Sequence, residues 1–308
     1  MKKTSIGGQA LLEGLLMIGP KNIAIAVRKP DGEITVEKRP APKKGIISKI
    51  PIVRGAVGLF RQMIIGIKGL MFSADFYDIE SDEEQPSKLD LFIEKLFGDK
   101  LKDVVIYFSV FISLIFSVGL FIVLPNLVTS FLDINRELWS GKVFSNIIEG
   151  IIRIGLFFSY LFFASKLKEM KRVWGYHGAE HKTIHCYENE EEMNVENIKK
   201  YSTRHARCGT SFLFFVMVVS ILVFSFIPFE ERWLNVLSRL VLIPLVAGLS
   251  YEIIKFAGRS ELKIFKFVSI PGLLFQKFTT SEPDDKQIEV AIEAFNNVVV
   301  EDEEADKW

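Results

Sequence analysis

The pattern of apolar and charged positions predicts which parts of the chain lie in a membrane. Residues 104–132 and 208–229 contain no charged side chain. Each stretch is long enough to cross the hydrocarbon layer as a helix, which takes about 20 residues. Residues 143–164 and 233–254 are also apolar, although they contain isolated charges: Glu149, Arg153, Arg239 and Glu252. The pattern therefore predicts a mainly α-helical, polytopic membrane protein with four transmembrane helices within residues 104–254.

The distribution of positive charge predicts the topology of these helices. Residues 166–207, between the second and third predicted helices, are rich in lysine and arginine. The connections at residues 133–142 and 230–232 are short and nearly balanced, and further basic residues follow the fourth helix. Because lysine and arginine concentrate in cytoplasmic loops, we expect a multi-pass protein of the inner membrane with loop 166–207 and both termini in the cytoplasm.

The N-terminal region, residues 1–50, is predicted to be a cytoplasmic segment containing a small β-hairpin. Residues 22–29 and 33–39 have strand-like composition and are joined by Pro30, Asp31 and Gly32, which is a typical turn sequence. The glycine-glycine-glutamine tripeptide at residues 7–9 precedes an apolar run, which favours a buried turn.

Residues 51–72 repeat apolar positions at helical spacing, with Arg54, Arg61 and Lys68 seven residues apart. This pattern predicts a basic amphipathic helix in the membrane interface. The four glycines of the stretch leave a re-entrant hairpin, packed against the transmembrane helices, as the alternative.

The remaining polar parts are an acidic region and the C-terminus. Residues 73–103 contain many carboxylates and a proline, which predicts a solvated linker and a short helix. Residues 255–308 are predicted to form a cytoplasmic amphipathic region.

Composition narrows the class of protein further. The chain has 49% hydrophobic residues and 27 phenylalanines, which agrees with a lipid environment. Lys and Arg together number 38, as do Asp and Glu, so no excess of positive charge points to nucleic acid. All four histidines and both cysteines lie between residues 177 and 208. This concentration favours metal binding over a chance arrangement on a surface helix.

The histidines follow a recognisable pattern. His177, Glu180 and His181 form an HxxEH sequence, and on a helix His177, His181 and His185 share one face. HxxEH is the inverted form of a zinc protease motif, in which two histidines hold the metal and the glutamate activates its water. The pattern predicts a divalent metal, Zn²⁺ in particular, with Glu180 as the catalytic base.

A catalytic zinc needs three protein ligands and an open position. His205 and Cys208 lie where the third predicted helix begins, and Glu252 lies where the fourth ends. Under the predicted topology these residues meet the histidine loop at one membrane surface, so each is a candidate third ligand. Supporting roles are expected for Glu13 and His185. Glu13, in an apolar stretch, should reach the metal or pair with a base such as Arg54 or Lys182.

Five strings resemble the YqhQ-like family of bacterial membrane proteins, which are described as predicted metal-dependent enzymes: GGQALLEGLLMIGP, WGYHGAEHKTIH, RCGTSF, GLSYE and TTSEPDD. The resemblance covers nearly the whole chain and implies a bacterial inner-membrane protein. It attaches importance to Gly8, Gln9, Glu13, Gly14, His177, Glu180, His181, Lys182, His205, Arg207, Cys208, Gly209 and Glu252. Ala206 departs from the proline usual in that family, which should alter the turn and spare the ligands.

Three functions compete at this stage. The first is a hydrolase-like metal enzyme whose site, at the cytoplasmic membrane surface, acts on a lipid-linked, peptide or membrane-protein substrate. The second is a transporter or channel that uses the intramembrane charges Glu149, Arg153 and Arg239. The third is a metal-stabilised scaffold that recruits a cytoplasmic partner. The lipid bilayer is a partner in all three.

Overall fold

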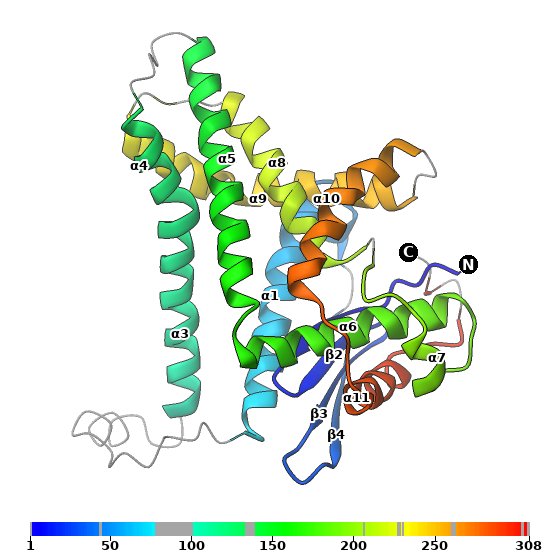
Figure 1. Cartoon of the computed structure of the whole chain (residues 1–308). Helices are drawn as coiled ribbons and strands as arrows, with labels where there is room; N and C mark the ends of the chain where they lie inside the picture. Colours follow the sequence, from blue (N-terminus) through cyan, green and yellow to red (C-terminus); the bar gives the residue numbers. More distant parts are fainter. Residues whose placement is uncertain are drawn as a thin grey trace, which may run out of the picture.

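The computed structural model describes residues 2–42, 45–77, 101–132, 139–205, 207–226, 229, 231–259, 263–302 and 305–306. The predicted acidic linker lies mostly at residues 78–100, outside the described residues, as does Ala206. A polar domain containing a β-sheet lies beside a set of long helices (Figure 1).

A four-stranded antiparallel sheet forms the N-terminal part of the polar domain. Its strands follow one another in chain order: β1 (Gly7–Leu11), β2 (Gly14–Ile18), β3 (Asn22–Arg28) and β4 (Ile34–Pro40). The predicted hairpin is confirmed as β3 and β4, with Gly32 at a φ of 92° in the turn. A positive φ is the conformation that glycine adopts without strain.

The hairpin of β1 and β2 was not predicted. Leu15, Leu16 and Met17 of β2 are all fully buried. A strand covered on both faces has a continuous apolar sequence rather than an alternating one. The apolar residues after Gln9 therefore lack the usual sign of a strand, and the sequence pattern favoured a buried turn there. The chain reverses at Leu12 and Glu13, where Glu13 has a φ of 45°.

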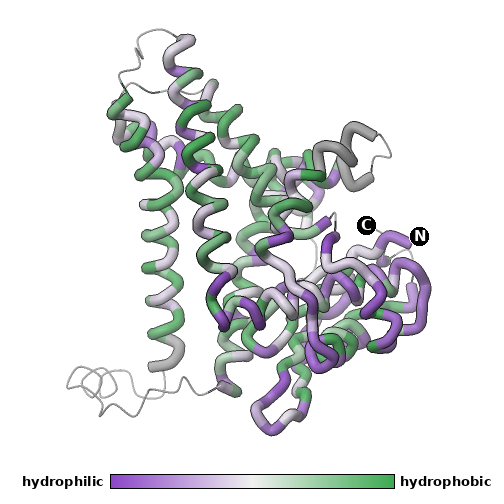
Figure 2. The backbone as a smooth tube through the Cα atoms, viewed as in Figure 1, coloured by the Kyte–Doolittle hydropathy of each residue, from purple (hydrophilic) through white to green (hydrophobic). Residues whose placement is uncertain are grey.

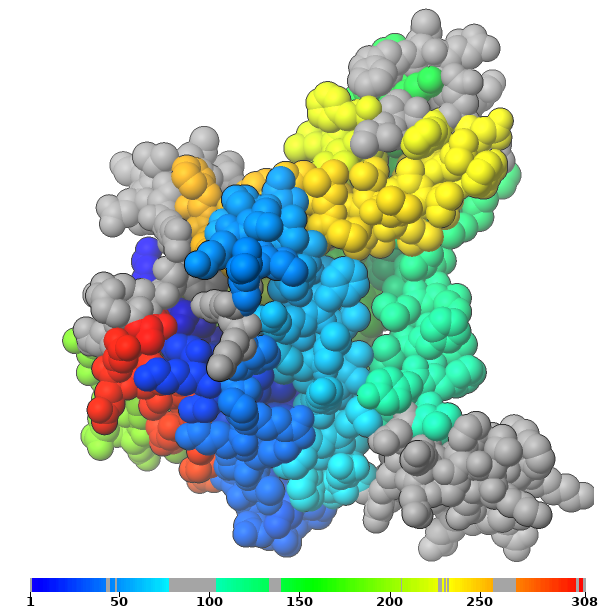
Figure 3. Space-filling view, turned by 180° about the vertical axis from the view of Figure 1, so that it is seen from behind, coloured from blue at the N-terminus to red at the C-terminus, as the bar shows by residue number. Residues whose placement is uncertain are grey.

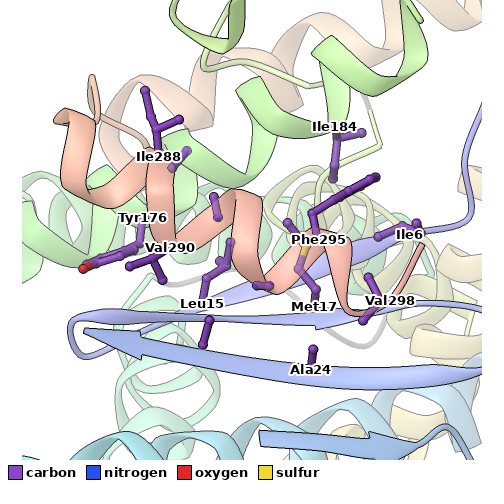
Figure 4. Close-up of a cluster of buried hydrophobic side chains, with 14 of the residues drawn as sticks. Ile6, Leu15, Met17, Ala24, Tyr176, Ile184, Ile288, Val290, Phe295 and Val298 are labelled. Atoms are coloured by element: carbon purple, nitrogen blue, oxygen red, sulfur yellow. The ribbon is translucent and has the colours of Figure 1, made fainter. Parts of the chain in front are cut away.

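Helices cover both faces of the sheet. On one face, α6 (Lys168–Glu188) and α11 (Asp285–Asn296) share a core with β2 and β3, in which Met17, Phe295 and Val298 meet (Figure 4). The short helix α7 (Val195–Lys199) extends this core through Ile198. On the other face, Leu16, Ile25 and Val27 pack against the last turns of α1 (Val53–Ala74). The N-terminal strands, the histidine helix and the C-terminal helix are therefore one folded unit.

The membrane character predicted from the sequence is confirmed in its coarse form. Five helices of the described part are long and apolar enough to cross a membrane: Val53–Ala74, Val104–Ser130, Ser140–Ala164, Gly209–Phe226 and Trp233–Phe256. The last four match the four predicted stretches. The first, Val53–Ala74, is the helix predicted to lie in the membrane interface. Figure 2 shows the contrast between these helices, where hydrophobic residues prevail, and the polar domain, where hydrophilic residues are frequent.

The long helices do not form a simple parallel bundle. The first comprises α3 (Leu101–Val118), one π-helical turn η3 (Gly119–Val123) and α4 (Leu124–Ser130). It runs beside α5 (Trp139–Ala164), which packs against α8 (Gly209–Phe226), whereas α9 (Arg232–Arg259) lies across these helices (Figure 1). Seen from behind, α1 and the N-terminal strands lie between α11 and α3, below α9 (Figure 3).

Glycines set the position of α1. A Cβ atom on Gly55 would lie 2.6 Å from the Tyr251 side chain of α9, and one on Gly69 would lie 2.7 Å from Leu16 of the sheet. The N-terminal part of α1 therefore packs closely on α9 and its C-terminal part on the sheet. The helix α10 (Lys263–Thr279) packs against α8 and leads into α11.

Candidate metal centre

His177, His181 and Cys208 come together between α6 and the start of α8. One potential ligand atom from each lies within 4.8 Å of the others. His177 Nε2 is 3.2 Å from Cys208 Sγ, and the two imidazole centroids are 4.5 Å apart. The helical spacing that places His177 and His181 on one face is the one expected from the sequence. The structure joins them to Cys208, one of the three candidate third ligands.

Backbone carbonyls orient both imidazoles. His177 Nδ1 lies 2.7 Å from the Thr279 carbonyl oxygen, and His181 Nδ1 lies 2.6 Å from the Thr203 carbonyl oxygen. A carbonyl only accepts, so these contacts assign the proton to Nδ1 in each ring. The Nε2 atoms are left with free lone pairs, which is the state that a metal ligand needs, and such carbonyl partners are typical of metal-binding histidines.

Cys208 is the residue that precedes α8. Its Sγ accepts a hydrogen bond from the Thr210 N–H at 3.4 Å and lies 3.2 Å from the Thr210 hydroxyl. The side chain is partly buried. This sulfur faces the histidine pair from the start of α8, so it is placed as a third ligand atom.

Two features of the fold bring the carbonyl partners to α6. A Cβ atom at Gly178 would lie 2.1 Å from the Ser281 carbonyl oxygen, so glycine permits the close approach of residues 279–281. Gln276 of α10 hydrogen-bonds both the backbone N–H and the carbonyl of His205 at 2.8 Å. The segment before α8 and the segment after α10 are thus both attached to the site.

Glu180 lies on the side of α6 that faces the sheet. It is 6% exposed, and its Oε1 accepts a hydrogen bond from the Gly8 N–H at 2.7 Å. A Cβ atom at Gly8 would lie 3.2 Å from the Glu180 carboxyl carbon, so glycine allows this contact. Burial raises the pKa of Glu180, while His177 and the Gly8 N–H act in the opposite direction. The neighbouring Gln9 instead reaches α1, where its side chain contacts the Gln62 carbonyl.

His185, Glu188 and His205 form a second group with metal-binding atom types. Glu188 already has partners: Arg207, whose guanidinium pairs with Oε1, and the Thr4 N–H at 2.9 Å. Burial opposes ionisation of Glu188, but hydrogen bonds from His205 and Arg207 lower its pKa to about 2. Burial also lowers the pKa of His205 to about 4. Because Arg207 supplies the positive charge here, we assign this group a structural role.

Three other predicted site residues have their partners outside the first group. Both Glu252 oxygens are occupied by Arg54, and Oε1 also accepts from the Ile52 N–H at 3.2 Å. Glu13 pairs with Arg172 rather than with Arg54 or Lys182. Lys182 lies 2.7 Å from Glu282 and donates to the Lys199 carbonyl.

The sequence reasoning missed Thr203 and Thr279, whose carbonyls orient the histidines. Their contribution comes from the backbone, so the residue type carries no signal. The only indication was that Thr279 begins the string TTSEPDD.

The fold and this site define a class of protein: a multi-helix membrane protein whose polar domain carries a histidine and cysteine cluster beside the first residue of a membrane helix. The chain belongs to the family described as protein of unknown function (DUF1385), which matches residues 50–301. It is similar to the uncharacterized protein YqhQ of Bacillus subtilis (strain 168), with 35% identity over 301 residues, 95% of this chain and 92% of that protein. No solved structure matches.

Proposed function

We propose that this protein is a zinc-dependent hydrolase of the membrane surface, with His177, His181 and Cys208 as the metal ligands. The observation that carries the proposal is the convergence of two imidazole Nε2 atoms and a thiol, each held by a backbone or helix-terminal contact. Nitrogen and sulfur ligands favour Zn²⁺. Three protein ligands leave one coordination position open, as catalytic zinc sites do.

Glu180 is the general base of this proposal. A zinc ion at the site would lower the pKa of a bound water to about 7 and polarise the substrate carbonyl. Glu180, one helical turn from His177, would accept the proton of the attacking water and pass it to the leaving group. Burial raises the pKa of Glu180, which makes its carboxylate a stronger proton acceptor than an exposed one.

Cys208 leads directly into an apolar helix, so the substrate is expected near the bilayer. A lipid-linked, peptide or membrane-protein substrate fits this position better than a freely soluble one. The predicted orientation in the inner membrane would place the reaction on the cytoplasmic side.

Metal analysis of the detergent-purified protein tests the ligand set. Wild-type protein should carry about one zinc per chain, while His177→Ala and His181→Ala should lose it. His185→Ala is the matched control, because His185 is on the same helix but outside the group. Equal zinc in all four proteins would overturn the proposed site.

Glu180→Gln tests the catalytic role separately. Zinc should stay bound while turnover of an ester or peptide panel in proteoliposomes falls by about 10²-fold or more. Glu169→Gln, on an exposed position of α6, is the control. Unchanged turnover would favour the scaffold alternative, in which the metal only adds rigidity.

The same geometry supports one metal-free alternative. The His177–Cys208 pair, with His177 oriented by the Thr279 carbonyl, has the arrangement of a cysteine nucleophile and its base. This alternative predicts a zinc-free protein in which Cys208→Ser abolishes turnover and Glu180→Gln does not. The transporter hypothesis predicts flux across proteoliposomes that neither substitution changes.

A further inference from the structure

Three charged residues are buried together among the apolar helices. Glu149 and Arg153 of α5 are 2% and 8% exposed, and Arg239 of α9 is 3% exposed. Glu149 Oε1 lies 2.8 Å from Arg153 Nη2, and Glu149 Oε2 lies 2.6 Å from Arg239 Nη2. Arg239 therefore points inward to the carboxylate rather than outward to the membrane interface.

The charges of this group do not cancel. One carboxylate faces two guanidinium groups, which leaves one net positive charge away from water. Arg153 is well satisfied, since it also donates to the Phe121 carbonyl at 2.7 Å and the Ser220 hydroxyl at 3.0 Å. Among the described residues, Arg239 Nη1 finds no hydrogen-bond partner. Arg239 Nη2 also donates to the Asn146 side-chain oxygen at 3.2 Å, and both guanidinium groups lie 5.6 Å from the centre of the Phe224 ring. None of these contacts supplies the second negative charge, and a buried donor without a partner is costly. Both features indicate that an anion completes the group.

A cavity of about 260 Å³ adjoins both arginines. Apart from Arg153, Arg239 and Ser220, its lining residues are apolar. Those from α8 run from Phe212 to Phe224, a length of about 18 Å along a helix. The rim includes exposed apolar side chains, Leu213 and Ile243, on helices that would face lipid. The cavity is thus long, apolar and charged at one part of its wall.

We infer that this cavity binds an anionic amphiphile, with a carboxylate or phosphate at Arg239 and Arg153 and one apolar chain along α8. Guanidinium groups pair well with these two anions. The cavity is slightly smaller than the roughly 300–1,000 Å³ typical of pockets for drug-sized ligands, so it suits a single chain rather than a whole two-chain lipid. A chain that enters from the bilayer passes the apolar rim.

Binding to full-length protein in phosphatidylcholine nanodiscs tests the inference. Oleate is the probe, and oleyl alcohol, with the same chain and no charge, is the matched control ligand. Oleate should bind at about one molecule per chain, and Arg239→Gln should weaken it by about tenfold or more. Arg61→Gln is the matched control variant, because it removes a positive charge from another helix, α1, and should leave oleate binding unchanged. Equal binding of the alcohol and the acid would overturn the inference.

A second variant keeps the inference testable if Arg239→Gln does not fold. Ile243→Trp preserves all three charges and fills the rim of the cavity, where Ile243 is 38% exposed. It should exclude oleate, and retained oleate in this variant would contradict a chain-binding cavity. Zinc content, measured on the same samples, should not change, which separates this site from the metal centre.

The source of the anion is distinguished by a parallel preparation in phosphatidylglycerol nanodiscs, with retained lipid counted by native mass spectrometry. Retained phosphatidylglycerol that oleate displaces identifies one chain of a bilayer phospholipid as the natural occupant. Oleate binding without retained phosphatidylglycerol identifies a free fatty acid. If wild-type protein retains no more oleate and no more phosphatidylglycerol than the Arg239→Gln variant does, the proposed site is refuted.

Discussion

A neutral imidazole binds a metal through its unprotonated nitrogen, while the other nitrogen carries the proton. The hydrogen-bond partner of the protonated nitrogen therefore decides which nitrogen of a histidine can bind a metal. His177 and His181 donate from Nδ1 to backbone carbonyls, so Nε2 is the unprotonated nitrogen in both rings, and His177 Nε2 lies 3.2 Å from Cys208 Sγ. His185 instead donates from Nε2, to the Arg204 carbonyl at 2.9 Å. Three histidines on one helix face therefore differ in role because their backbone neighbours differ.

The two cysteines should differ in alkylation. Burial raises the pKa of Cys186 to about 11, with Glu191 adding to the effect, and this thiol is fully buried. Cys208 sits at a helix terminus and is partly exposed. In chelator-treated protein at pH 8, iodoacetamide should modify Cys208 well before Cys186, because only thiolates react. Adding Zn²⁺ should protect Cys208, and peptide mass mapping measures both. Zinc-independent labelling of Cys208 would exclude it as a ligand.

Glu188 is expected to be important for stability. It is 2% exposed and pairs with Arg207, so Glu188→Gln leaves a cation poorly compensated and should cost about 3 kcal/mol. In the folded protein its pKa, about 2, lies below the ordinary glutamate value of 4.5. The stabilisation is therefore fully present above pH 4.5 and is lost as the pH falls toward 2. Thermal unfolding in detergent measures the loss. The exposed Glu196→Gln is the control, and equal midpoints for the two variants would contradict the assignment.

At the scale of elements, the site depends on how closely the chain after α10 approaches α6. Replacing Gly178 with alanine adds a Cβ atom 2.1 Å from the Ser281 carbonyl oxygen, which must then move. The displacement would carry Thr279, the partner of His177, away from the helix.

Gly178→Ala should therefore weaken zinc binding and lower stability by about 1–3 kcal/mol, although alanine favours a helix by nearly 1 kcal/mol over glycine. Gly155→Ala in α5 is the matched control, since nothing lies within 4 Å of its added Cβ. Competition with a zinc chelator and thermal unfolding check both effects. Zinc affinity at the wild-type level would show that the close approach does not matter for the site.

At the scale of the molecule, the folded unit of sheet, α6 and α11 constrains the topology. The chain leaves this unit after β4 and returns to it at α6, so it crosses the bilayer an even number of times between them. Among the described residues of that interval, the candidates are α1, α3 with α4, and α5. The described residues 45–52, just before α1, contain one short 3₁₀ helix, Ile46–Lys49, which is too short to cross lipid. If the two longest candidates, α3 with α4 and α5, both cross the bilayer, the number of crossings is already even, so α1 does not cross.

Cysteine labelling in whole cells tests this topology. A cysteine at Ser140, where α5 begins, should react with an impermeant maleimide from outside. Cysteines at Asp75, after α1, and at Glu196, in the polar domain, should react only after permeabilisation, with wild-type protein as background. External labelling at Asp75 would mean that α1 crosses the membrane.

Much of the coarse architecture was readable from the sequence. Apolar runs of helical length identify membrane helices because lipid offers the backbone no hydrogen-bond partner. The hairpin of β3 and β4 has local turn chemistry at Gly32, and the HxxEH spacing alone places two histidines on one face. Each of these features depends on residues close together in the chain. The strand β2 was missed because burial of both its faces removes the alternation that identifies a strand, and its partner β1 was missed with it.

Only the tertiary structure decided which distant groups meet. Cys208 joins the histidines, while Glu252, equally near the predicted membrane surface, is bound by Arg54. Glu13 pairs with Arg172, and Glu149 faces two arginines from different helices. A buried polar group must find a partner, and the sequence states this need without naming the partner. The choice depends on distances between elements far apart in the chain, which the packing of the sheet, α6 and α8 sets.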